Sequence, residues 1–171
     1  MEVATLSPVP VYVVRRAGGT RPAAENGGWV AVAADGRAPA SALLARWAAR
    51  HVITRPGQAA VLAHVAPHGA SESPEVEAAL TEAADALRSS GARVTLARVA
   101  TAFDTRDALV DLAGSGVQGG PPGAPDLLVL ATRGPAPLRR AALGAVAAYV
   151  VQHAPAALCL VPPPALAKQG A

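Results

Sequence analysis

The 171-residue sequence contains very few cysteine, aromatic and lysine residues. Its one cysteine, Cys159, excludes an internal disulfide, and a thiol inside an apolar run is more often an inert core residue than a nucleophile. Aromatic residues make up 3% of the chain and hydrophobic residues 51%, so the core must be built from alanine, valine and leucine. Length and composition together fit one domain in which helices of small residues cover a sheet.

The basic residues are almost all arginine, because Lys168 is the only lysine, and the formal net charge is +3. These arginines are scattered, and no basic run alternates with aromatic residues. Nucleic-acid binding is therefore not expected. Phosphate binding needs only one or two local arginines and remains open.

A long stretch, residues 141–161, carries no charge at neutral pH and is long enough to cross a membrane. Gln152, His153 and Pro155 interrupt it, and much of its apolarity is alanine. A helix followed by a core strand is the preferred interpretation, with a membrane span as the alternative. The first ten residues do not read as a secretory signal, so we expect a cytoplasmic protein without membrane contact.

Apolar runs of strand length alternate with helical patterns along most of the chain. The sequence predicts strands at about 8–15, then at 29–34, 59–65, 93–99, 127–131 and 157–161. Helices are predicted at about 39–51, 74–90, 104–112 and 137–153. This alternation is typical of an α/β fold, with five parallel strands, helices on both faces and an extra N-terminal strand.

The region from Asp126 to Val161 combines a buried strand, a glycine turn and a helix that Pro137 can open. Free N–H groups at a helix start that faces a strand end form a common anion site. Gly134 allows close approach of the backbone. Arg133, Arg139 and Arg140 place positive charge nearby, so we expect function here.

An acidic turn, Asp35-Gly36-Arg37, directly follows the first central strand. Ligands of open parallel sheets bind at the carboxyl ends of strands, where the strand order reverses. This turn and the turn at residues 132–137 would flank that crevice if their strands are neighbours. Capping of the next helix is the alternative role of Asp35, and the two roles are compatible.

Three stretches resemble the universal stress protein family: VAVAADGRAPASALLARWAA, AHVAP and DLLVLATRGPAPLRRAALGAVAAYVVQHAPAALCLVP. The resemblance covers roughly residues 28–162. It implies a five-stranded parallel sheet of order 3-2-1-4-5 and dimerisation through the last strand, residues 157–161. It also implies that the chain belongs to a family in which some members bind ATP and others do not.

In ATP-binding members the signature is glycine, two residues, glycine, nine residues, glycine, then serine or threonine. Those four positions hold Ala131, Gly134, Gly144 and Ala145 here, so the spacing is intact and two residues differ. By resemblance, the two glycines would bring backbone N–H groups to the phosphates, while Ala145 lacks the hydroxyl. Ala131 adds a methyl group where the family uses glycine.

The resemblance also assigns the adenosine end of the crevice. Asp35 corresponds to the acidic residue of the family near adenosine, and Gly36 follows it in the same turn. Val65 corresponds to the position whose backbone meets adenine. Arg37 stands where the family often has serine.

Residues 7–16, SPVPVYVVRR, resemble the last strand of the same family and compare with residues 154–162, APAALCLVP. One hypothesis is that the chain is the second half of a tandem arrangement, and an ordinary N-terminal extension is the alternative. The extra strand would then pair with the edge at residues 157–161, within the chain or across a dimer. The expected organisation is an extension at 1–27, a domain at 28–163 and a tail at 164–171.

Other patterns carry no chemistry. The glycines at 114, 116 and 119 spell G-x-G-x-x-G, but a helix precedes them and a loop follows, whereas the dinucleotide fingerprint needs a strand before and a helix after. The four histidines lack metal-ligand spacing, and His64 is interpreted as a satisfied core or crevice residue. No nucleophile or general base is recognisable, so at most weak ATP hydrolysis is expected.

The resulting hypothesis is a regulatory, stress-related module that binds ATP, with Mg²⁺, or another adenine nucleotide weakly. The alternative is a dimerisation or protein-interaction module whose crevice is vestigial. In both cases we expect a homodimer through residues 157–161, with a contribution from residues 8–15.

Overall fold

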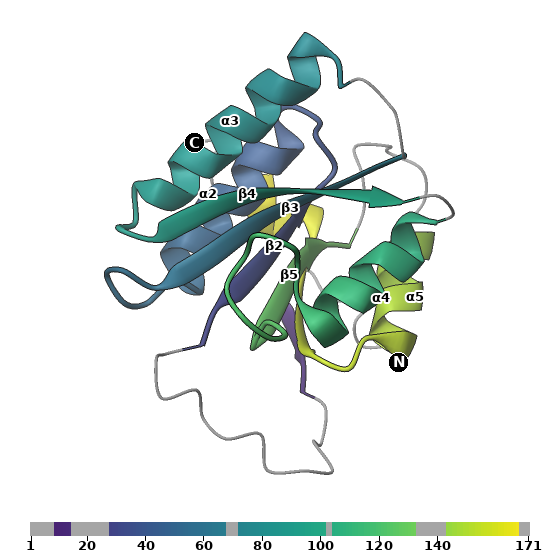
Figure 1. The fold of residues 1–171 in the computed structure, drawn as a ribbon. Helices are drawn as coiled ribbons and strands as arrows, with labels where there is room; N and C mark the ends of the chain where they lie inside the picture. Colours follow the sequence, from purple (N-terminus) through teal and green to yellow (C-terminus); the bar gives the residue numbers. More distant parts are fainter. Residues whose placement is uncertain (1–8, 15–27, 68–71, 102–103, 133–142, 168–171) are drawn as a thin grey trace.

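The computed structural model describes residues 9–14, 28–67, 72–101, 104–132 and 143–167. The chain alternates strands and helices (Figure 1). In order, the elements are β1 (Val11–Val13), β2 (Val30–Ala34), α2 (Ala40–His51), β3 (Ala59–Pro67), α3 (Pro74–Arg88), β4 (Arg93–Thr101), α4 (Thr105–Ser115), β5 (Leu127–Ala131), α5 (Ala145–His153), β6 (Ala157–Val161) and α6 (Pro163–Ala167).

The strands form one mixed sheet of six in the order β1-β6-β5-β2-β3-β4. The β4-β3-β2-β5-β6 part is parallel throughout, with the predicted strand order. The N-terminal strand does not stand apart from this sheet, because β1 pairs with β6 in antiparallel orientation. The sheet therefore has six strands and is mixed, where the sequence predicted five parallel strands and an extra one.

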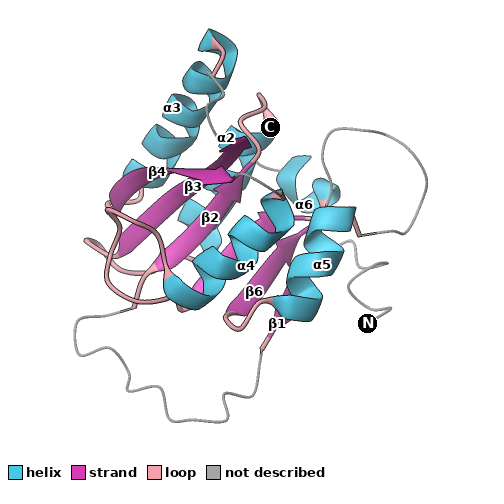
Figure 2. Ribbon diagram, turned by 45° about the vertical axis from the view of Figure 1, so that its right-hand side comes forward, coloured by secondary structure: helices cyan, strands magenta, loops and turns pink. Residues whose placement is uncertain are grey.

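Helices cover both faces of the sheet (Figure 2). Helices α2, α3 and α6 pack on one face, and α4 and α5 pack on the other. Alternate residues of each strand enter the two cores, so that Val30 and Val32 face α2 while Ala31 lies in the core beneath α4 and α5. Leucine, valine and alanine supply most of the buried residues, as the scarcity of aromatic residues predicts.

The helix predicted from Pro137 is wrong in its extent. Leu143 and Gly144 are not helical, and α5 begins only at Ala145. The Gly144 N–H donates to the Thr132 carbonyl at 2.8 Å, so the backbone before α5 is tied to the end of β5 instead of extending the helix. Residues 133–142, including Pro137, lie outside the described part of the chain.

The uncharged stretch at 141–161 is divided between α5 and β6, and the helix covers only Ala145–His153. Among the described residues, no helix is both long enough and apolar enough to cross a bilayer. The preferred interpretation of this stretch, a helix followed by a core strand, is confirmed.

The residues predicted as a C-terminal tail contain a short helix, α6. Ala165 and Leu166 are buried and join the core beside α2. Consecutive prolines at 162–164 favour the interpretation of a tail, but proline is compatible with the first turn of a helix. The folded part of the chain therefore extends past residue 163.

Candidate functional site

A cavity of about 400 Å³ opens at the carboxyl ends of β2, β3 and β5. Strand β2 lies between β3 and β5, so the chain leaves β2 toward one side and returns to its other side with β5. This is the place where an open parallel sheet accepts a ligand. The cavity is lined by Ala33, Ala34, Asp35, Arg37, Ala40, Ser41, Leu44, Ala63, Val65, Thr105, Leu109, Leu130, Ala131 and Val146.

Asp35 is held in the turn between β2 and α2. Its Oδ1 accepts hydrogen bonds from the Arg37 backbone N–H at 3.0 Å and from the Ser41 hydroxyl at 3.2 Å. The N-cap of α2 is Pro39, which makes no side-chain cap hydrogen bond. Asp35 thus does not act as the N-cap of α2. It braces the turn and stays exposed at the cavity wall.

Gly36 allows this turn to lie close to the neighbouring strand and helix. Its φ is +74°, a conformation that side chains disfavour. A Cβ atom there would lie 2.8 Å from Val76 Cγ1 and 2.9 Å from His64 Cε1. Gly36 is buried and does not line the cavity, so its role is to place Asp35.

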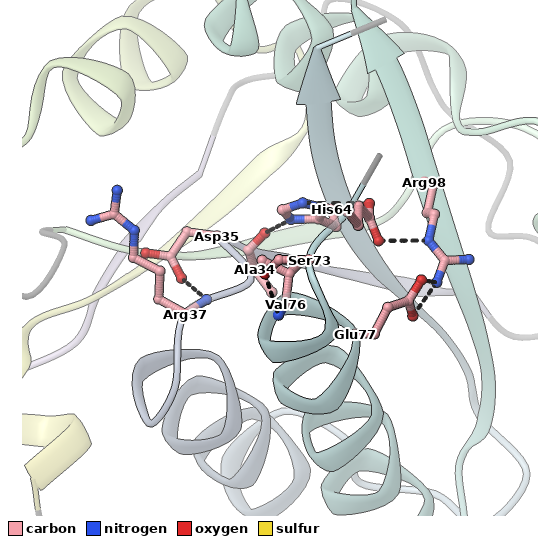
Figure 3. A network of polar contacts seen from close by, with 9 residues as sticks. Ala34, Asp35, Arg37, His64, Ser73, Val76, Glu77 and Arg98 are labelled. Atoms are coloured by element: carbon pink, nitrogen blue, oxygen red, sulfur yellow. Dashed lines mark hydrogen bonds and ion pairs between the residues drawn. The ribbon is translucent and has the colours of Figure 1, made fainter. Parts of the chain in front are cut away.

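His64 on β3 contacts the end of β2, directly before the turn (Figure 3). Its Nδ1 lies 3.1 Å from the Ala34 carbonyl oxygen. Because a carbonyl only accepts, Nδ1 must carry the proton and donate. His64 is 7% exposed and hydrogen-bonded, so its interpretation as a satisfied core or crevice histidine is confirmed.

Acidic and basic side chains continue from His64 to the edge of the sheet. Glu72 Oε1 lies 3.6 Å from His64 Nε2, and Glu72 Oε2 accepts from Arg98 Nε at 2.9 Å. Arg98 also binds Glu77 on α3 (Figure 3). The hydrogen bond to Glu72 is the main cause that raises the pKa of Arg98. The network joins β3, α3 and β4 behind the Asp35 turn.

Val65 lies one residue past His64, the last β3 residue that pairs with β2, and it lines the cavity. Asp35 and Val65, both predicted as site residues, are therefore brought together at the same mouth. The assignment of both residues to a nucleotide site stays a prediction.

The β5 side of the cavity is built from small apolar residues. Ala131 lines the cavity as an ordinary strand residue paired with Val161, so its methyl group narrows the space without backbone strain. Gly144, predicted to offer its N–H to a phosphate, donates that N–H to Thr132. Ala145, an exposed residue with no hydroxyl, is the first residue of α5.

Three predicted site residues, Arg133, Gly134 and Arg139, lie outside the described residues, as does Arg140. The positive charge expected at this side of the crevice therefore stays a prediction.

Sequence reasoning missed the polar residues Ser41 and Thr105 and the apolar Val146 at the cavity wall. Ser41 is the second residue of α2 and Thr105 is the first residue of α4. Their position in the sequence could have predicted both polar residues. The first turn of a helix that follows a parallel strand lies at the ligand-binding end of the sheet.

The described residues contain no group of three or more histidine, cysteine, aspartate or glutamate side chains that could hold a metal ion. The G-x-G-x-x-G pattern lies at the end of α4 and in the following turn, not between a strand and a helix. The pattern therefore lacks the strand before it and the helix after it that a dinucleotide fingerprint requires.

Comparison with known proteins gives one family. The model of the universal stress protein family matches residues 123–162, which span β5, α5 and β6. A search of curated proteins gives no significant match.

Solved structures show the same fold. A universal stress protein from Archaeoglobus fulgidus superposes with a TM-score of 0.61 at 22% identity, over 77% of this chain and 96% of that chain. The Archaeoglobus fulgidus protein in complex with dAMP gives 0.56 at 20% identity, over 77% and 95%. The hypothetical protein MJ0577, whose structure was used for a structure-based assignment of biochemical function, gives 0.60 at 15% identity, over 79% and 95%.

At these identities the structural likenesses establish the fold. Together with the family match at the C-terminal block, they confirm the resemblance to the universal stress protein family that the sequence indicates.

Proposed function

We propose that this chain, which resembles the universal stress protein family, is a regulatory module whose cavity binds an adenine nucleotide weakly. The observation that carries the proposal is the cavity itself, which lies where β2 separates β3 from β5 and exposes the Asp35 carboxylate. Its volume of about 400 Å³ is in the range of small-molecule sites. One structural neighbour was solved in complex with dAMP.

The β2–β3 side supplies the nucleoside contacts in this proposal. Both described hydrogen bonds of Asp35 go to Oδ1, and a carboxylate has a second oxygen that can accept from a sugar hydroxyl. Val65 extends past the last pair with β2 and offers its backbone to the edge of a base. The apolar wall formed by Ala33, Ala63 and Leu109 suits the flat face of a purine.

The β5 side supplies little to the phosphates. Of the N–H groups that the resemblance assigns to them, that of Gly144 is engaged by Thr132. The first N–H groups of α5 remain without intrahelical acceptors, as at any helix start, and they favour an anion. We therefore expect binding that depends mainly on the nucleoside, with Mg²⁺–ATP held little better than AMP.

The alternative is an interaction module whose cavity is vestigial. It is favoured by the alanines at 131 and 145, since the first narrows the cavity and the second lacks a hydroxyl. In both cases we propose at most weak ATP hydrolysis. The predicted homodimer through β6 also stays a proposal. Within the chain, β1 pairs with the edge of β6 that such a dimer would use.

The deciding experiment is calorimetric titration of nucleotide-stripped protein with AMP, ADP, ATP and dAMP. We expect dissociation constants on the order of 100 μM. Val146→Trp should abolish the heat, because Val146 is 37% exposed at the cavity wall and an indole there would fill the mouth. The matched control is Gln152→Trp, on an exposed position of the same helix away from the cavity. No heat and no thermal shift at millimolar ATP would reject nucleotide binding and favour the interaction module.

A further inference from the structure

Arg37 brings a guanidinium group to the same wall of the cavity as the Asp35 carboxylate. Among the described residues it is the one arginine that lines this cavity. Its side chain leaves the turn on the side of Asp35 that faces away from His64 (Figure 3). A positive charge therefore lies on the β2 side of the cavity, to which the proposed function assigns the nucleoside.

The backbone of Arg37 is fixed at both of its polar groups. Its N–H donates to Asp35 Oδ1 at 3.0 Å, and its carbonyl oxygen accepts from the Ser41 N–H at 2.9 Å. The side chain thus starts from a constrained turn, although Arg37 itself is exposed. Replacement of this side chain would leave both backbone hydrogen bonds in place.

The guanidinium group of Arg37 has no hydrogen bond or ion pair with any described residue. It contacts its acidic neighbour Asp35 only through the backbone N–H. Other described arginines are ion-paired with carboxylates, namely Arg46, Arg88, Arg98 and Arg106. At the cavity wall, by contrast, the donors of the Arg37 guanidinium group are available to a bound anion.

A ribose ring would present two neighbouring hydroxyl groups to this wall. Both hydrogen bonds of Asp35 with described residues go to Oδ1, so Oδ2 is left to accept from one hydroxyl. The second hydroxyl lies on the adjacent carbon and on the same face of the ring, beside the first. In dinucleotide sites an acidic residue binds a ribose hydroxyl, and an arginine nearby accommodates a phosphate on the ribose. A guanidinium group holds such a phosphate through two parallel hydrogen bonds.

We propose that the cavity selects an adenine nucleotide with a phosphate on one ribose hydroxyl, the 2′ or the 3′, and that Arg37 binds this phosphate. The inference rests on the proposed function, in which Asp35 accepts from a sugar hydroxyl. The Asp35 carboxylate repels a phosphate placed on the hydroxyl that it binds. The site therefore accepts one of the two isomers and disfavours the other.

The described part of the β5 side favours the same choice. The Gly144 N–H is engaged by the Thr132 carbonyl, and Ala131 adds a methyl group at the cavity wall. None of the described residues that line the cavity on this side is positively charged. A phosphate consequently gains more from Arg37 than from the described part of the β5 side.

Calorimetric titration of the nucleotide-stripped full chain with adenosine and its 2′-, 3′- and 5′-monophosphates tests the proposal. We expect either the 2′- or the 3′-phosphate to bind about 10-fold more tightly than adenosine and the 5′-phosphate. In Arg37→Ser all four compounds should bind alike. Arg37→Lys keeps the charge but not the two parallel hydrogen bonds, so it should retain part of the preference. The matched control is Arg50→Ser, at an exposed position in the last turn of α2 and outside the cavity, which should retain all of it.

The outcomes separate this inference from the function on which it rests. If adenosine and the 5′-phosphate bind and neither isomer binds more tightly, selection of a ribose phosphate is wrong, while nucleotide binding stands. Equal affinity for the 2′- and 3′-phosphates would also overturn the inference, because Asp35 and Arg37 would then not distinguish the two hydroxyl groups. A preference that survives in Arg37→Ser would show that another residue binds the phosphate. If none of the four compounds gives heat, the proposed function fails, and this inference fails with it.

Discussion

The described parts of the two sides of the cavity, after β2 and at the end of β5, are built in different ways. The turn after β2 is fixed from several directions, because Asp35 binds Arg37 and Ser41 while Gly36 lies against His64 and Val76. In the described part of the β5 side, backbone hydrogen bonds join Gly144 to Thr132 and Thr132 to Val161, and the side chains there include the methyl groups of Ala131 and Ala145.

If the cavity binds an adenine nucleotide as proposed, this difference separates two parts of its recognition. The β2 side has a carboxylate and a strand end held in fixed geometry, which suits recognition of a nucleoside. The β5 side has lost the hydroxyl and the glycine that the resemblance associates with phosphate contact. The four substitutions that follow should act differently on the two sides.

Gly36→Ala should have the largest effect. The positive φ costs about 1–2 kcal/mol for an alanine, and the contacts at 2.8 and 2.9 Å add overpacking of about 1–3 kcal/mol. Urea unfolding should show a loss of about 2–4 kcal/mol, summing the lower part of these ranges. Gly57→Ala is the control, since Gly57 has φ +77° but nothing within 4 Å of its Cβ position. Equal losses for the two variants would show that His64 and Val76 do not constrain the turn.

Asp35→Ala should have the next largest effect, on binding. Loss of a hydrogen bond to a charged group costs about 1.5–3 kcal/mol, so the affinity for AMP and ATP should fall about 10- to 100-fold. Calorimetric titration measures it, with Asp85→Ala on the exposed face of α3 as control. An unchanged affinity would place the nucleoside away from Asp35.

The fold was predictable because its signals are local and repeated. Alternating apolar runs and helical patterns predict the parallel strands, and the order β4-β3-β2-β5-β6 follows from the resemblance. Helix α6 was missed because the prolines at 162–164 look like a tail. The predicted start of α5 was wrong because Pro137 is a good first helical residue. The hydrogen bond that stops the helix at Gly144 joins residues twelve positions apart, so it leaves no pattern in the sequence.

The sequence predicted that Asp35 and Val65 lie at the ends of neighbouring strands, and the structure places both at the cavity wall. Their role in binding stays a prediction. Contacts between elements were not predictable. The support of Ala34 by His64, and the space that Gly36 leaves for His64 and Val76, arise only when β2, β3 and α3 are packed together. Pairing of β1 with β6 was foreseen as one of two arrangements, and the structure shows the one within the chain.

His64→Leu tests the buried support of the rigid turn. It leaves the Ala34 carbonyl without its donor and Glu72 without the ring nitrogen, which should cost about 1–3 kcal/mol of unfolding free energy. His64→Asn keeps an N–H donor near the position of Nδ1 and should recover part of the loss. Urea unfolding of both variants makes the comparison. If asparagine were no better than leucine, the hydrogen bond to Ala34 would not be what stabilises the turn.

Ala145→Ser should have the smallest effect and acts on the other side of the cavity. Ala145 is exposed at the first position of α5, so a hydroxyl fits there without repacking the core. One added hydrogen bond contributes about 0.5–1.5 kcal/mol, so the affinity for ATP should rise roughly 2- to 10-fold. The affinity for adenosine should not change, because the hydroxyl would contact phosphates only. Parallel titrations with adenosine, AMP and ATP measure the difference. Equal gains for all three would show that α5 does not face the phosphates, and the contrast between the two sides of the cavity would then not correspond to the two ends of a nucleotide.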